Sequence, residues 1–116
     1  MAGIMRHAGG ARSGLTIWLL QRASAVWLAL ASPVLLWLFA QASSFETWRA
    51  LFVPLPVKLG VLLTVVALLL HAWIGLREVL MDYVHPLLLR MALLLAFGVG
   101  VLLCLAWTVH ILWSLV

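Results

Sequence analysis

Charged side chains are absent from three long stretches of this chain. Residues 23–45, 59–76 and 91–116 contain no Asp, Glu, Lys or Arg. Roughly 20 apolar residues, each rising about 1.5 Å, carry a helix across the hydrocarbon core of a bilayer. The sequence therefore predicts an all-α integral membrane protein with three transmembrane helices, near residues 17–40, 57–80 and 88–114.

Composition indicates a single domain that lies mostly in the bilayer. The 116 residues are 67% hydrophobic and 9% charged, whereas a soluble domain is about half apolar and a quarter charged. No repeat divides the chain, so residues 1–116 are predicted to form one membrane domain. The single cysteine, Cys104, excludes an intrachain disulfide and a cysteine-ligated iron–sulfur site. Three helices bury little surface by themselves, which indicates a subunit of a larger assembly.

Basic residues are distributed unequally between the two ends of the predicted helices. The positive-inside rule places the richer end, with the N-terminus and the 77–90 connection, in the cytoplasm. The first apolar segment is longer than a signal-peptide core and has no small-residue cleavage site after it. The segment before it is short for an organelle transit peptide, so we expect a multi-pass protein of the bacterial inner membrane. The richer end carries Arg6, Arg12, Arg22, Arg77 and Arg90, and the other end carries Arg49 and Lys58.

One histidine, His71, lies inside the second predicted helix. An unsatisfied imidazole is costly in hydrocarbon, so such a residue is expected to have a partner. Three roles suit it: a hydrogen bond to another helix, a proton relay, or an axial ligand to haem iron. Gly75 follows one turn later on the same face and leaves room for a flat macrocycle, which favours the haem role.

No second histidine of the predicted helices lies at the depth of His71. His71 is about 9 Å along the helix from Arg77, whereas His110 is about 30 Å from Arg90 on the same side. A haem with two histidine ligands therefore needs the second one from another polypeptide. Arg22 lies on the side nearest to His71, where it suits either a haem propionate or a position extended toward the membrane surface.

The segment from His71 to Arg90 resembles the hydrophobic membrane-anchor subunit of succinate dehydrogenase, the D-type chain of respiratory complex II. The shared pattern is H-x-W-x-G, then D-Y, then a proline and an arginine, and it reads HAWIGLREVLMDYVHPLLLR in this chain. The start of the first helix, residues 21–26, the chain length and the three-helix layout are also similar to that family.

The resemblance implies roles for four residues. His71 corresponds to an axial ligand of a b-type haem whose other ligand comes from the companion cytochrome b anchor subunit. Arg22 corresponds to an arginine near a haem propionate. Tyr83 corresponds to a tyrosine that hydrogen-bonds ubiquinone, and Asp82 to its acidic neighbour. FAD and the iron–sulfur clusters of this electron-transport complex of the tricarboxylic acid cycle belong to the flavoprotein and iron–sulfur subunits, which dock on the cytoplasmic face.

The residues at the end of the second helix also have simpler interpretations. Tyr83 is a hydrogen-bond donor at the membrane edge, which suits a quinone carbonyl and equally an ordinary interfacial tyrosine. Asp82 suits proton transfer, a cap of the third helix, or an ion pair with Arg77.

By this resemblance the chain is an anchor, not catalytic alone, of a succinate:quinone oxidoreductase. The anchor of a fumarate reductase-type complex is an alternative, because the sequence does not give the direction of the reaction. A cofactor-free assembly bundle is another. A small proton-coupled transporter is a further alternative that needs a carboxylate within the membrane, whereas the acidic residues lie at or beyond the helix ends: Glu46, Glu78 and Asp82.

Overall fold

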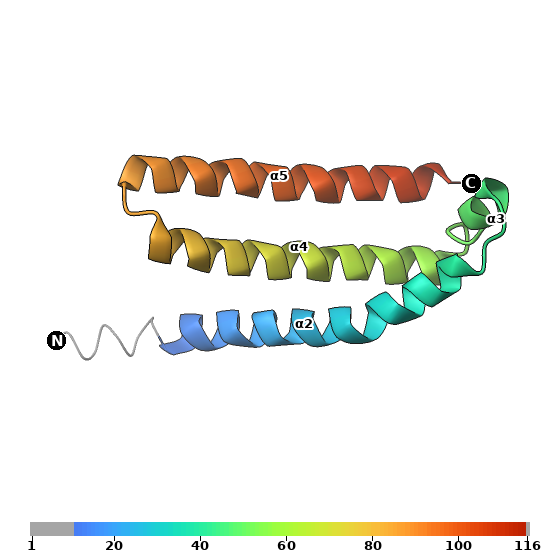
Figure 1. Ribbon diagram of the computed structural model, residues 1–116, viewed down its shortest axis with the longest axis horizontal. Helices are drawn as coiled ribbons and strands as arrows, with labels where there is room; N and C mark the ends of the chain where they lie inside the picture. The colour runs from blue at the N-terminus through green and yellow to red at the C-terminus, as the bar shows by residue number, and fades with distance from the viewer. Residues whose placement is uncertain (1–10, 116) are drawn as a thin grey trace.

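The computed structural model describes residues 11–115, which form four helices joined by short connections (Figure 1). Three of them are long and apolar enough to cross a membrane. Residues 11–115 contain no strand. The predicted all-α fold with three membrane-spanning helices is confirmed, and each long helix extends beyond its predicted bounds at one end or both. The helices are α2 (Ala11–Ala40), α3 (Phe45–Ala50), α4 (Leu55–Tyr83) and α5 (Leu87–Ser114).

Prolines define where α4 and α5 begin. Pro54 is the N-cap of α4, Pro56 lies in its first turn, and Pro86 is the N-cap of α5. A proline has no N–H to leave unpaired at a helix start, and its fixed φ suits that position. Pro33 lies inside α2, and Figure 1 shows α2 bending in its second half. A proline removes one backbone hydrogen bond of the helix, which accounts for such a bend.

The short helix α3 lies against the end of α2. Its N-cap Ser44 accepts a hydrogen bond from the backbone of Thr47, and the Thr47 hydroxyl accepts one from the backbone of Ser44. This reciprocal pair satisfies two N–H groups at the helix start. The rings of Phe39 and Phe52 stack with centroids 4.3 Å apart, and Trp48 packs on Phe52 at 4.8 Å. These aromatic contacts hold α3 and the following turn in place.

Helix α4 lies between α2 and α5. Close contacts join α2 to α4 and α4 to α5, and Figure 1 shows the three long helices side by side in a layer. Trp27 of α2 donates its Nε1–H to Thr64 Oγ1 of α4 over 3.1 Å. On the other side, Trp73 of α4 packs on Gly98 of α5, where an added Cβ would lie 3.6 Å from the indole ring. The central helix is therefore attached to each neighbour through a tryptophan.

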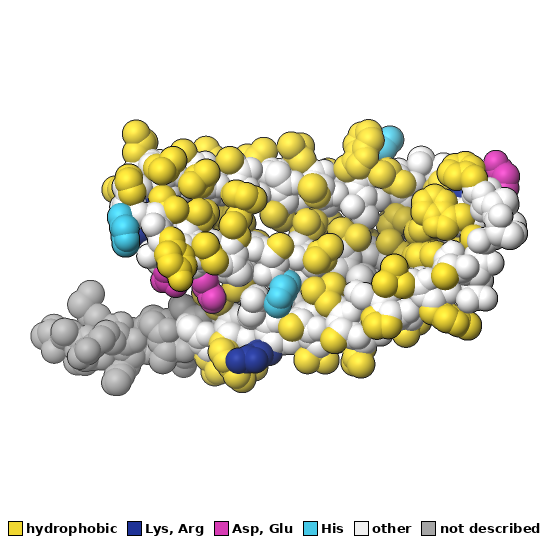
Figure 2. Space-filling model, in the orientation of Figure 1, with side chains coloured by type: hydrophobic (Ala, Val, Ile, Leu, Met, Phe, Trp, Pro, Cys, Tyr) yellow, Lys and Arg dark blue, Asp and Glu magenta, His cyan; other side chains and the backbone are white. Residues whose placement is uncertain are grey.

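Few side chains are enclosed by this chain alone. The buried residues within the described range are Ser24, Ala67, Ile74, Leu80 and Leu112. Large apolar side chains cover the outer surfaces of all three long helices (Figure 2). In a bilayer such surfaces face lipid tails or further membrane helices. The chain is thus a layer of helices with almost no core of its own.

Basic side chains lie at both ends of this layer. Arg77 near the end of α4 and Arg90 near the start of α5 flank the connection of residues 84–86. At the opposite end, Lys58 Nζ donates a hydrogen bond to Leu115 O over 2.9 Å. The Lys58 ammonium satisfies a carbonyl that has no partner within the helix, and its positive charge interacts favourably with the negative end of the α5 dipole. Arg6, one of the predicted cytoplasmic residues, lies outside the described range.

Candidate functional site

His71 lies where α4 contacts α2. Its Nδ1 is 3.2 Å from the Oγ of Ser24, which precedes it by 47 residues. Ser24 is buried, and its hydroxyl also donates to Gln21 O over 3.0 Å. Helix α4 is continuous through His71, so the backbone fixes the level of the imidazole. The polar residue that the sequence places inside a membrane helix thus has a polar partner on the neighbouring helix.

The H-x-W-x-G residues contact both neighbours of α4. His71 and Gly75 face α2, and a Cβ added at Gly75 would lie 3.8 Å from Gln21 Nε2. Trp73 faces α5 through Gly98. Residues one turn apart share a helix face, whereas a residue two positions away lies on nearly the opposite side. The motif therefore contacts both α2 and α5. Because Gly75 has no side chain, space remains next to it, and the Gln21 side chain borders that space.

A hollow of about 640 Å³ opens between α2 and α4 beside His71. Figure 2 shows histidine, acidic and basic side chains close together on this face. The predicted residues His71 and Arg22 lie in the same pocket, which we call the His71 pocket. Sequence reasoning had not assigned the remaining polar groups to it. The polar lining consists of Gln21, Arg22, His71, Arg77 and Glu78.

Arg22 has a defined contact within the His71 pocket. Its guanidinium carbon lies 5.2 Å from the ring centre of Trp18, one turn earlier on α2. A guanidinium over an indole is attracted to the negative face of the ring. The side chain is nevertheless exposed, so its N–H groups remain available to an anion.

The lining of the His71 pocket fits one side of a haem site. Residues 11–115 contain no group of three His, Cys, Asp or Glu side chains that could hold a metal ion. A haem brings four nitrogen ligands and needs only axial ligands from protein. His71 offers one imidazole, while Arg22 and Arg77 offer cations for the two propionates. Gln21 Oε1 is a buried acceptor without a partner in the described range, and as an acceptor it does not pair with a propionate. The donor set suits a haem with one axial ligand from this chain.

Tyr83 and Asp82 lie apart from the His71 pocket, at the end of α4. Tyr83 is the last residue of the helix, and its side chain is 77% exposed. The axial rise from His71 to Tyr83 is about 18 Å because the helix is unbroken between them. Asp82 follows His71 by about three turns and so lies on the same helix face. Pro86 is the N-cap of α5 and makes no side-chain cap hydrogen bond.

The other described histidines lie away from His71. His110 is exposed near the end of α5, with its ring centre 5.4 Å from that of Trp107. His85 is exposed in the connection between α4 and α5. His7 lies outside the described range. Residues 11–115 therefore place no second imidazole beside His71.

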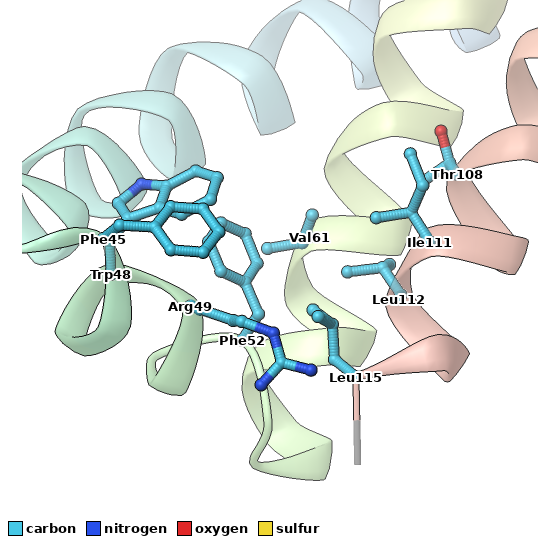
Figure 3. Close-up of a pocket in the computed structure, with 9 residues that line it drawn as sticks. All are labelled: Phe45, Trp48, Arg49, Phe52, Val61, Thr108, Ile111, Leu112 and Leu115. Atoms are coloured by element: carbon cyan, nitrogen blue, oxygen red, sulfur yellow. The ribbon is translucent and has the colours of Figure 1, made fainter.

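A separate hollow of about 330 Å³ lies at the opposite end of the layer. Figure 3 shows aromatic rings on one wall, aliphatic side chains on the other, and the Arg49 guanidinium reaching between them. Its lining contains no histidine and no carboxylate, so it lacks the imidazole and the carboxylate of the His71 pocket. Its lining consists of Phe45, Trp48, Arg49, Phe52, Val61, Thr108, Ile111, Leu112 and Leu115.

Sequence reasoning missed Ser24 and Arg77 as parts of the site. Ser24 had a signal that could have been used, because it is a polar residue inside the first apolar stretch and can satisfy a polar residue of another helix. Arg77 had been used for topology, for the depth of His71 and as an alternative ion-pair partner of Asp82, but not as a residue of the haem site. Its place in the His71 pocket depends on the packing of α4 against α2.

Comparison with known proteins finds a family and a relative that each match most of the chain. Residues 4–109 match the family described as "Succinate dehydrogenase/Fumarate reductase transmembrane subunit". A protein of Coxiella burnetii (strain RSA 493 / Nine Mile phase I) named "Succinate dehydrogenase hydrophobic membrane anchor subunit" is 31% identical over 109 residues. The match covers 88% of this chain and 90% of that protein.

Proposed function

This chain belongs to the succinate dehydrogenase/fumarate reductase transmembrane-subunit family, and we propose that it holds one side of a haem and part of a ubiquinone site. It is a multi-pass membrane anchor subunit of such a complex. The observation that carries the proposal is the His71 pocket, where an imidazole and two guanidinium groups line the same hollow.

In the proposed haem site, His71 is one axial ligand of a b-type haem and the cytochrome b anchor subunit supplies the other. When bound, the haem supplies a one-electron carrier within the membrane. Arg22 and Arg77 line the same pocket as His71, and they are suited to binding the two propionates as charge-assisted hydrogen-bond donors. A haem is then shared between two chains, which agrees with a layer of helices that encloses little on its own.

The proposed ubiquinone site lies at the end of α4. The Tyr83 hydroxyl donates a hydrogen bond to a quinone carbonyl oxygen, which gains electron density as electrons arrive. Reduction of the quinone to the quinol takes two electrons and two protons. The electrons come from succinate through the FAD and iron–sulfur clusters of the partner subunits, and Asp82 passes protons from water. The 77% exposure of Tyr83 leaves its ring available to quinone and partner chains.

The charge distribution supports one orientation in the membrane. We place the arginine-rich end, with the N-terminus and the connection of residues 84–86, on the cytoplasmic side of a bacterial inner membrane. The flavoprotein and iron–sulfur subunits dock at that end, next to Tyr83. The chain alone catalyses no reaction in this arrangement. We favour succinate oxidation over fumarate reduction because the Coxiella burnetii relative is named for succinate dehydrogenase.

The haem proposal is tested by changing His71 in the whole complex. We expect His71→Ala to lower haem content or shift the reduced b-type absorbance band, because one axial ligand is lost, while the chain still inserts into the membrane. His110→Ala is the matched control, since His110 is a membrane-helix histidine that lies away from the His71 pocket. A wild-type haem content and spectrum in His71→Ala would contradict the assignment, as would an equal loss in both variants.

A further inference from the structure

An imidazole binds iron only through a ring nitrogen that carries no hydrogen. The neutral ring has one N–H and one free lone pair, and the partner of either nitrogen decides which is which. In His71 that partner is Ser24, whose Oγ lies 3.2 Å from Nδ1. The direction of this hydrogen bond therefore decides which nitrogen of His71 is available as a ligand.

A second contact of Ser24 sets that direction. Its Oγ also lies 3.0 Å from Gln21 O, which can only accept. A hydroxyl has one hydrogen to donate. If that hydrogen goes to Gln21 O, then Nδ1–H donates to Oγ and both contacts are hydrogen bonds. If it goes to Nδ1, only one contact is a hydrogen bond. Ser24 is 5% exposed, and a buried polar group favours the arrangement that satisfies more bonds.

Nε2 then carries the free lone pair. Within residues 11–115, the hydrogen bond of the His71 ring is made by Nδ1. Among the described residues, the buried side-chain nitrogen or oxygen atom that has no hydrogen-bond partner is Gln21 Oε1. His71 Nε2 also has no partner there but is not such a buried atom, so it is accessible from outside the chain. We infer that Ser24 is a positioning residue, which accepts Nδ1–H, sets the tautomer and ring orientation of His71, and leaves Nε2 to bind iron. This inference rests on the proposed haem role of His71.

The same hydrogen bond also affects the strength of the ligand. An imidazole that donates its second N–H is more basic at the ligating nitrogen, and loss of such a partner typically changes metal affinity by about 10–100-fold. A more basic ligand stabilises ferric iron relative to ferrous iron. A neutral hydroxyl is a weaker acceptor than a carboxylate, so we place the expected effect of Ser24 near the lower limit, at about tenfold.

The test uses the purified complex with all of its subunits. Ser24→Ala removes the acceptor. Ser24→Thr and Ser24→Val are a matched pair of similar size, and only threonine keeps a hydroxyl that can bond to the preceding turn. Thr64→Val is the packing control, because it removes the hydrogen bond from Trp27 that also joins α2 to α4 and leaves His71 untouched. The readouts are the haem midpoint potential and the low-spin electron paramagnetic resonance signal, neither of which is an enzyme rate.

We expect Ser24→Ala and Ser24→Val to keep haem but lose about tenfold in preference for the ferric state. That change raises the midpoint potential by about 59 mV for a one-electron couple. Ser24→Thr and Thr64→Val are expected to keep the wild-type potential and signal. If Ser24→Ala does not assemble, the Thr and Val pair makes the same comparison.

The outcomes separate this inference from the proposal on which it rests. An unchanged potential in the variants without the hydroxyl, together with an altered spectrum in His71→Ala, would refute the role of Ser24 alone. Equal shifts in Ser24→Val and Thr64→Val would assign Ser24 to helix packing and also refute it. A wild-type complex without haem, or a His71→Ala variant with a normal haem spectrum, would instead refute the proposed haem site.

Discussion

Replacing Arg22 by Met is expected to weaken haem retention about tenfold while the complex still assembles. Arg22 shares the His71 pocket with His71 and Arg77. Methionine keeps most of the apolar stem that packs along the helix and removes the charge. The chain would then offer one guanidinium in that pocket in place of two, so one of the two haem propionates would lose a charged partner.

The size of the effect depends on how exposed the guanidinium is. A hydrogen bond to a charged group contributes about 1.5–3 kcal/mol. Arg22 is exposed, which places its contribution near the lower limit, about 1.5 kcal/mol or roughly tenfold in affinity. Arg22→Met also removes the contact of Arg22 with the Trp18 ring, at 5.2 Å, which contributes to the stability of the chain.

The assay is transfer of haem from the purified complex to an excess of apomyoglobin. We expect Arg22→Met to release haem about tenfold faster than wild type, with Arg22→Lys between them because lysine keeps the charge but not the planar fork. Arg49→Met is the control, since Arg49 lines the hollow at the opposite end. The reasoning is wrong if Arg22→Met retains haem as long as wild type, or if Arg49→Met releases it equally fast.

Two further predictions concern Tyr83 and Lys58. Tyr83→Phe removes one hydroxyl from an exposed ring and should slow quinone reduction by about tenfold, the value of one lost hydrogen bond. Succinate oxidation by an artificial dye should stay normal. Equal losses in both assays would contradict a quinone role. Lys58→Met removes the 2.9 Å bond to Leu115 O and should lower the unfolding free energy in detergent by about 1 kcal/mol without changing the haem spectrum. Thermal unfolding measures this loss, and an unchanged Tm would show that the contact contributes nothing.

Several parts of the candidate site could be found from the sequence. His71 is conspicuous because it is a polar ring in an otherwise apolar stretch, and Arg22 because it is a charge at the start of another. The structure places both in one pocket, and it places Tyr83 and Asp82 at the end of α4. The roles of these four residues remain predictions. Their positions follow from the charge map because residue number along an unbroken helix gives depth in the membrane.

The partners of His71 could not be found in the same way. A helix that is apolar on every side has no polar face to show which side meets a neighbour. Depth alone allows Ser24 to meet His71, but rotation of α2 and α4 about their axes decides whether they meet. Helix rotation also decides that Trp73 packs on Gly98, whereas a Cβ added at Gly100 would have no neighbour within 4 Å.

The sequence by itself determined how many times the chain crosses the membrane and where two of the three long helices, α4 and α5, begin. A backbone in hydrocarbon must satisfy its own hydrogen bonds, so uncharged stretches of sufficient length become helices, and prolines define two of their starts. Only the tertiary structure decided that α4 is central and that a serine hydroxyl 47 residues away contacts the imidazole. These choices depend on side-chain fit between helices, because burial of apolar surface does not distinguish one face from another when lipid is as apolar as protein.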